Sequence, residues 1–254
     1  MSAQVPPSPP DWLVARPIAH RGLHDRAAGI PDNTIASAEA AIAAGYAIEC
    51  DVQASADGEA MVFHDAALGR LTEATAEIGT QRAEALVQLA VAGTAERIPT
   101  LPAFLARIAG RTPLIVEVKT RFTGDLALTR RVAAIVAAYD GPVAVKSFDP
   151  DLVAALAGLA PGIPRGIVAE SGQDDPSYAG LPQARRAALA GLLHLGESRP
   201  GFVSWRVDDL PAGPPYLCRL LGAMPVMTWT VRTEDQRALA RRHADQMVFE
   251  GFRP

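Results

Sequence analysis

The sequence AIECDVQASADGEAMVFHD, residues 47–65, begins with a short apolar strand pattern that carries Glu49 and Asp51 two positions apart. Side chains at i and i+2 of a strand point to the same side, so the two carboxylates face one place. They repel each other there unless a cation lies between them. A divalent metal ion is the simplest such cation, and oxygen ligands suit magnesium or calcium. Alone, the pair is a weak indication, because acid-x-acid pairs also arise by chance as solvated caps or halves of salt bridges.

The same stretch continues through a tight turn into a second strand pattern. Asp57-Gly58 is typical of such a turn. The pattern over residues 60–63 then ends in His64 and Asp65. An imidazole and a third acid therefore follow the paired carboxylates closely in sequence.

Length and charge narrow the class of protein. The chain has 254 residues, of which 49% are hydrophobic, and this suits one barrel domain of about 250 residues. The net charge of −4 and the pI of about 5.7 do not indicate nucleic acid or an anionic membrane as the main partner. The sequence does not determine the oligomeric state.

The cysteines and the apolar runs indicate a reducing compartment. Cys50 and Cys218 are too few for a disulfide framework, and Cys50 faces away from the paired acids as a buried small residue. The proline-rich start, MSAQVPPSPPDW, lacks the basic and apolar regions of a signal peptide. Apolar runs end before the roughly 18 residues that a membrane span needs, so neither stable membrane insertion nor a location outside the cytoplasm is expected.

Strand and helix patterns alternate along most of the chain, which predicts an α/β fold. Strands are expected at 17–22, 47–53, 114–119, 142–147, 165–170, 202–207, 226–230 and 246–250. Helices are expected from Asn33 or Thr34 to Gly45, near 82–91, and at 101–109, 125–138, 150–159, within 182–194, and at 214–222 and 234–243.

Eight strands in this alternation favour a (β/α)8 TIM barrel that forms a single domain over residues 1–254. A proline-rich arm over 1–14 is expected to lie along the surface, and 54–110 is interpreted as an insertion after the second strand. The competing doubly wound sheet would carry a glycine-rich phosphate loop after its first strand, and Gly22-Leu23-His24-Asp25-Arg26 lacks that spacing.

Charged and polar residues recur where the predicted strands end. The carboxyl ends of the strands are where (β/α)8 barrels hold their catalytic and binding residues. They are His20, Arg21, Glu49, Asp51, Glu117, Lys119, Lys146, Ser147, Glu170 and Trp229. Charges that face a barrel interior are costly unless they compensate one another. Here acids and bases are both present, so we expect a mutually compensating cluster in which Lys146 contacts phosphate or pairs with Glu117.

Six short motifs along the chain resemble the glycerophosphodiester phosphodiesterase family. They are AHRG at 19–22, PDNT at 31–34, ECDV at 49–52, FHD at 63–65, EVK at 117–119 and SF at 147–148. The resemblance implies a barrel with an insertion after its second strand and one bound divalent ion, Mg²⁺ or Ca²⁺. It implies Glu49, Asp51 and Glu117 as metal ligands, His20 and His64 as the acid–base pair, Arg21 and Lys119 as phosphate contacts, and Trp229 as an aromatic wall beside the glycerol.

Two positions depart from the family pattern. Asp32 stands where the family usually has glutamate in its first loop, which keeps the charge. Glu250 stands nearest to the aspartate that usually ends the last strand, so the floor of the site is less well defined. His24, His194 and His243 lack a comparable context and are interpreted as surface or structural residues.

The resemblance implies metal-dependent hydrolysis of glycerophosphodiesters to sn-glycerol 3-phosphate and an alcohol. Imidazoles suit acid–base work near neutral pH, and cationic side chains suit an anionic phosphodiester. Direct attack by water, or attack by a glycerol hydroxyl to give a cyclic phosphate first, stays open, as does which histidine is the acid. The alternatives are a lysophospholipase D-like phosphodiesterase and a non-catalytic barrel that binds glycerophosphodiesters.

Overall fold

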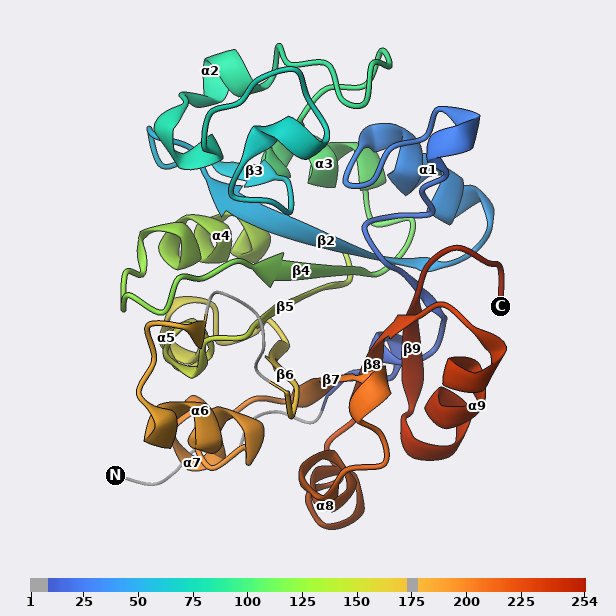
Figure 1. The fold of residues 1–254 in the computed structure, drawn as a ribbon, viewed down its shortest axis with the longest axis vertical. Coiled ribbons are helices and arrows are strands. Elements are labelled where there is room, and N and C mark those ends of the chain that lie inside the picture. Colours follow the sequence, from blue (N-terminus) through green and yellow to red (C-terminus); the bar gives the residue numbers. More distant parts are fainter. Residues whose placement is uncertain (1–8, 173–177) are drawn as a thin grey trace.

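The computed structural model describes residues 9–172 and 178–254. Within them, eight parallel strands close into a barrel, because β1 pairs with both β2 and β9 (Figure 1). The barrel strands are β1 (Ile18–Ala19), β2 (Ala47–Ala54), β4 (Leu114–Val118), β5 (Val143–Ser147), β6 (Arg165–Ala169), β7 (Phe202–Arg206), β8 (Val226–Val231) and β9 (Gln246–Phe249). The closed sheet confirms the predicted (β/α)8 barrel and excludes the doubly wound alternative, which would leave two open edges.

Helices surround the strands on the outside of the barrel (Figure 1). They are α1 (Ile35–Ala43), α3 (Leu101–Ile108), α4 (Ala127–Ala137), α5 (Pro150–Leu159), α6 (Gln183–Ala190), α7 (Leu195–Ser198), α8 (Gly213–Gly222) and α9 (Glu234–His243). Among the described residues, no helix is both long enough and apolar enough to cross a membrane.

Capping side chains start the helices at the expected places. Thr34, rather than Asn33, caps α1, and its hydroxyl accepts a hydrogen bond from the Ser37 N–H. Thr233 caps α9 in the same way. Asn33 is therefore free to serve the site described below.

The segment between β2 and α3 forms a small layer beside the barrel. Strand β3 (Ala60–Val62) runs antiparallel to β2, and its Met61 packs in a separate apolar cluster with Phe63. Helix α2 (Ala83–Leu86) is shorter than the expected 82–91, because the chain folds back there and Val91 N–H bonds to the Glu96 carbonyl. The single-domain interpretation and the insertion bounds 54–110 stay predictions.

Inward-facing side chains fill the barrel in layers. The layer near the strand starts is apolar, and two positions further along most of these strands the same face carries a charged or titratable side chain. The apolar layer comprises Leu13, Ile18, Ala47, Ile115, Ala144, Phe202, Met227 and Val248. Leu13 is buried in it, so the prediction of a surface arm over 1–14 is wrong at this residue, whose apolar side chain helps to close the barrel floor. Residues 1–8 of the predicted arm lie outside the described residues.

Candidate active site

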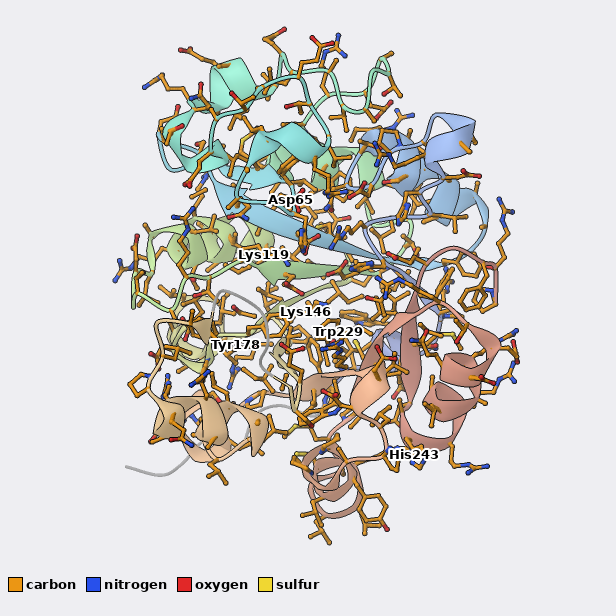
Figure 2. The ribbon with its side chains drawn as sticks, viewed as in Figure 1. Asp65, Lys119, Lys146, Tyr178, Trp229 and His243 are labelled. Atoms are coloured by element: carbon orange, nitrogen blue, oxygen red, sulfur yellow. The ribbon has the colours of Figure 1, made fainter. Side chains whose placement is uncertain are left out.

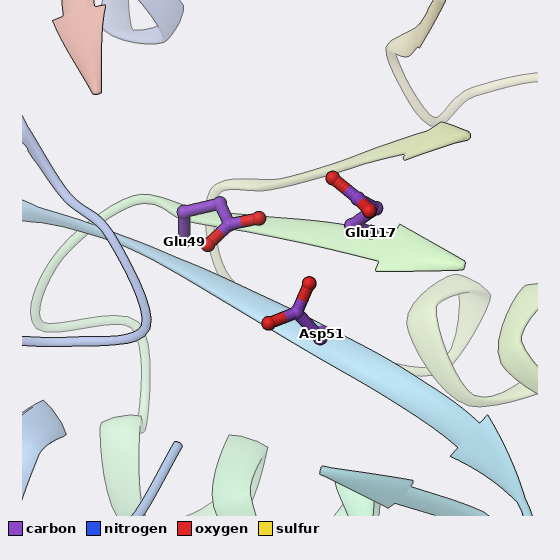
Figure 3. A group of neighbouring side chains, drawn as sticks. All are labelled: Glu49, Asp51 and Glu117. Atoms are coloured by element: carbon purple, nitrogen blue, oxygen red, sulfur yellow. The ribbon is translucent and has the colours of Figure 1, made fainter. Parts of the chain in front are cut away.

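Three buried carboxylates lie together above the apolar layer. Glu49 and Asp51 point inward from β2, and Glu117 points inward from the neighbouring strand β4 (Figure 3). One oxygen atom from each lies within 4.8 Å of the others. Three oxygen donors at this spacing could hold a metal ion. The strand alternation predicted this convergence, since positions 49 and 51 share one face.

Two lysines compensate these acids. Lys146 Nζ lies 3.1 Å from Glu49 Oε1 and 3.2 Å from Glu117 Oε2. Lys119 Nζ lies 2.7 Å from Asp51 Oδ1 and 2.5 Å from Glu117 Oε1. Lys119 and Lys146 both reach toward the centre of the barrel (Figure 2). A metal ion at the carboxylates would therefore compete with two ammonium groups for the same oxygens.

The electrostatics favour the ionised cluster. Burial on its own would raise the pKa of Asp51, but Lys119 and Arg21 outweigh it and hold that pKa well below its usual range. Burial likewise opposes ionisation of Glu117, yet Lys119 and Lys146 lower its pKa to about 2. Asp51 and Glu117 are therefore charged at neutral pH, in the form that a cation or a cationic side chain requires.

A tight turn after β1 brings Arg21 over the same acids. Arg21 Nε lies 3.1 Å from Asp51 Oδ2. The next residue, Gly22, has φ +80°, and a Cβ there would collide with Ser37, so glycine is required. Asn33 completes the arrangement, because its Nδ2 donates to Asp51 Oδ2 at 2.9 Å.

His20 is held by a carboxylate at one ring nitrogen. Its Nδ1 lies 2.5 Å from Glu250 Oε2, while its Nε2 lies 4.0 Å from Glu49 Oε2. Glu250 also accepts a hydrogen bond from Arg232 Nε at 2.6 Å, and His24 Nε2 lies 3.5 Å away. Burial opposes the charge on Glu250, but His20 and His24 hold its pKa far below the usual value. The departure from the family pattern at position 250 thus still leaves a carboxylate on His20.

His64 is held in a matching way. Its Nδ1 lies 2.6 Å from Asp65 Oδ1, and Arg70 Nε donates to the other oxygen of Asp65. Arg70 also donates to Asp32 Oδ2 at 3.0 Å. Burial opposes ionisation of Asp65, but His64 and Arg70 lower its pKa to about 2. Asp32, the other departure from the family pattern, is therefore the second carboxylate that holds Arg70 in place.

One cavity of about 930 Å³ connects these groups. Of the eight residues that the sequence singled out for the site, seven line it: His20, Arg21, Asp51, His64, Glu117, Lys119 and Trp229. The eighth, Glu49, lies beneath it and is reached through Lys146. The rings of Trp229 and Phe148 pack edge to face with their centroids 5.5 Å apart. The Phe148 ring packs in the same way on Tyr178, with the centroids 6.3 Å apart. The cavity lining thus combines charged side chains with aromatic ones, among them Lys119, Lys146, Tyr178 and Trp229 (Figure 2).

Among the other lining residues, Lys146 and Glu170 were expected at strand ends, whereas Arg206 was not singled out in the sequence. Glu170 and Arg206 form an ion pair of 3.2 Å at the cavity wall. Lys146 pairs with Glu117, which is one of the two contacts that the sequence led us to expect for it. No local signal indicates Arg70, because its contacts depend on how the segment after β3 folds back. His194 is buried away from the cavity lining, with its Nδ1 2.9 Å from Ser198 Oγ, whereas His24 lies beside Glu250 at the site.

The barrel and its site define a class of protein. A charged cavity at the carboxyl ends of barrel strands, with two anchored imidazoles beside clustered acids and cations, is the construction of a hydrolase for an anionic substrate. The family model for the glycerophosphoryl diester phosphodiesterase family matches residues 20–249. The chain belongs to that family of enzymes.

Individual relatives agree with this membership. A glycerophosphodiester phosphodiesterase of Caldanaerobacter subterraneus subsp. tengcongensis is 26% identical over 242 residues, which cover 91% of this chain and 92% of the relative. YhdW of Bacillus subtilis (strain 168) is 30% identical over 160 residues, and this match spans 59% of this chain but only 64% of YhdW.

Solved structures share the fold. A phosphodiesterase of Oleispira antarctica, solved with the product sn-glycerol-3-phosphate, superposes with a TM-score of 0.73 at 23% identity, over 92% of this chain and 91% of that one. A glycerophosphodiester phosphodiesterase of Thermotoga maritima gives a TM-score of 0.70 at 22% identity, over 91% of this chain and 92% of that one.

Proposed function

We propose that the protein hydrolyses glycerophosphodiesters to sn-glycerol 3-phosphate and an alcohol, with His20 and His64 as the acid–base pair. The observation that carries this proposal is the shared anchoring of the two imidazoles. Each is bound through Nδ1 to a carboxylate, Glu250 or Asp65, and both rings line the cavity of the acid cluster. A histidine held at Nδ1 in this way has Nε2 left for proton transfer.

The two histidines divide the proton transfers between them. One accepts the proton of the attacking hydroxyl, and the other donates a proton to the oxygen of the departing alcohol. Each transfer contributes a factor of roughly 10²–10⁴ to the rate. A binding protein for the same ligand has no use for two anchored imidazoles, so this arrangement favours an enzyme over a non-catalytic barrel.

Arg21 and Lys119 are proposed to contact the phosphate. Both line the cavity, and each already touches Asp51. A planar guanidinium can hold two phosphate oxygens, and an ammonium adds a point charge. Together they offset the charge that makes a phosphodiester resistant to nucleophiles. Trp229 is proposed to pack against the glycerol from the aromatic side of the cavity.

Glu49, Asp51 and Glu117 are proposed to hold one divalent ion, Mg²⁺ or Ca²⁺. Their oxygen donors, burial and mutual spacing fit such an ion. When bound, the ion supplies positive charge and Lewis acidity at the phosphate. Lys119 and Lys146 then share the carboxylates with it.

The test is release of sn-glycerol 3-phosphate from glycerophosphocholine and glycerophosphoethanolamine. We expect release to stop with a chelator and to return with Mg²⁺ or Ca²⁺. His64→Ala should remove most turnover while it leaves the ion affinity nearly unchanged, and Glu49→Gln should weaken that affinity. Hydrolysis of lysophospholipids alone would favour the lysophospholipase D-like alternative, and binding without turnover would favour the non-catalytic barrel.

The cytoplasm is proposed as the compartment. Cys50 and Cys218 are both free thiols, which suits a reducing environment. Immunoblotting of the tagged full chain in separated cytoplasmic and membrane or extracytoplasmic fractions would test this location. Recovery mainly outside the cytoplasmic fraction would contradict it.

A further inference from the structure

Helix α8 has an apolar outer face. Tyr216, Leu217, Leu220 and Leu221 are 58%, 52%, 61% and 77% exposed. Their spacing places them along one side of the helix, opposite Pro215 and Cys218, which are buried. Only two other large hydrophobic residues of the described chain are comparably exposed, namely Leu159 and Leu193. Such a concentration on one surface helix of a globular protein indicates a binding surface.

The helix lies at the periphery of the barrel (Figure 1). It packs on β7 and β8, so its buried side is already satisfied. The outer side has no contact with the rest of the described chain that would remove it from water. Within residues 9–172 and 178–254, no segment covers this face.

The charge of the surrounding segment is opposite to that of the rest of the protein. Residues 181–254 contain ten arginines against seven acids, a net charge of +3, whereas residues 1–180 carry a net charge of −7. The overall charge of −4 conceals this asymmetry. Arg206 and Arg232 of this segment line the active-site cavity. Arg219, Arg241 and Arg242 lie on α8 or in the last turn of α9, and positive charge beside an apolar face favours an anionic partner.

The end of α9 lies near α8 and carries basic residues. Arg219 Nε on α8 lies 2.8 Å from Asp245 Oδ1, just beyond the end of α9. The last turn of α9 contains Arg241, Arg242 and His243, and His243 lies at the end of α9 nearest to α8 (Figure 2). Arg241 and Arg242 are both exposed, and Arg241 Nη1 lies 3.4 Å from Glu234 Oε1. Arg242 forms no ion pair with the residues that the structure describes, so its charge is available.

We propose that α8 docks the protein on the surface of an anionic lipid bilayer. The apolar face would enter the headgroup region, and Arg241 and Arg242 would contact lipid phosphates. A second copy is the less suitable occupant, because a two-fold interface across α8 would bring the same arginines of both copies together. The ten-residue helix is about 15 Å long, so it lies on the bilayer and does not span it.

Vesicle flotation with the full chain tests this docking and does not depend on the proposed catalysis. We expect binding to vesicles of phosphatidylcholine mixed with phosphatidylglycerol, and little binding to phosphatidylcholine alone. Leu220→Ser/Leu221→Ser should lower the partition coefficient by about tenfold or more, because each methylene placed in the bilayer adds affinity. Arg241→Gln/Arg242→Gln should lower it by several fold and reduce its dependence on salt.

Leu159→Ser is the matched control, since Leu159 is an exposed leucine on α5. It should bind vesicles as the unaltered protein does. The circular dichroism spectra of all variants should match that of the unaltered protein, which shows that they are folded. Binding that survives the leucine substitutions on α8 would overturn the proposal, as would no binding to either vesicle. A dimer in light scattering that is lost with Leu220→Ser/Leu221→Ser would overturn it in favour of self-association.

Discussion

His20 Nδ1 lies 2.5 Å from Oε2 of Glu250, the residue that follows the last barrel strand. The two residues come from opposite ends of the chain, and they meet because β1 and β9 are neighbours in the closed barrel. His64 has the same relationship with Asp65, which is adjacent in sequence. The protein thus orients both imidazoles with carboxylates, one through the barrel closure and one locally.

Glu250→Gln should reduce turnover by roughly 100-fold while the fold is kept. The amide preserves the volume of the carboxylate but not its charge, so it favours the wrong ring tautomer of His20 and stabilises the imidazolium less. Steady-state hydrolysis of glycerophosphocholine measures the effect. Glu234→Gln on the surface of α9 is the control and should leave turnover unchanged. Equal activity of Glu250→Gln and the unaltered enzyme would remove Glu250 from the mechanism.

Arg70→Gln should lower kcat by about 10- to 100-fold with a smaller effect on KM. Arg70 joins Asp65 to Asp32, so its loss frees the carboxylate that orients His64. The pH profile of kcat should move as well, because the charge on Asp65 is less well compensated. Arg82→Gln, which removes an exposed arginine of the same segment, serves as the control. An unchanged pH profile with a general loss of stability would mean that Arg70 is only structural.

The barrel could be predicted from the sequence because it follows from local patterns. Apolar runs, capping residues and strand–helix alternation are properties of neighbouring residues, and eight such units leave few architectures. The early end of the short helix α2 could not be predicted. It depends on a hydrogen bond from the Val91 N–H to the Glu96 carbonyl, which forms only in the folded segment. The burial of Leu13 was missed for the same reason, because the barrel floor that it closes is assembled from strands far apart in sequence.

The acid cluster was predictable in part for a similar reason. Alternation places Glu49 and Asp51 on one face, and the ends of parallel strands meet in a barrel. The partners of the histidines differ in this respect. Asp65 is adjacent to His64 and could be suspected, whereas Glu250 reaches His20 only through closure of the sheet. The roles of the site residues stay predictions until the variants are measured.

The stability of the protein should fall between pH 6.5 and about pH 4 through His194. Burial lowers the pKa of His194 to about 4 in the folded state. The unfolded chain binds a proton there near pH 6.5, so stability is fully present above that pH and is lost as the pH falls to the folded pKa. The contribution is about 3 kcal/mol at most. Urea unfolding at several pH values should show this slope, and His194→Gln should flatten it. The same slope in both proteins would assign it to other groups.

Lys146→Met should make the folded state depend on a divalent ion. The ammonium group of Lys146 lies between Glu49 and Glu117, both buried, so its removal leaves Glu49 without its lysine partner and Glu117 with Lys119 alone, at a cost of about 3–5 kcal/mol. For a chain of this size the midpoint of thermal unfolding should fall by roughly 10 °C.

Mg²⁺ or Ca²⁺ should restore most of this loss in Lys146→Met, because the ion supplies the missing charge to the same oxygens. The unaltered protein should gain less, since there the ion must displace or share the ammonium group. Adding Glu117→Gln to Lys146→Met removes one carboxylate and should abolish the ion response. An equal rise in the unfolding midpoint of both proteins, with no difference between Lys146→Met and the double variant, would show that the ion binds away from these carboxylates.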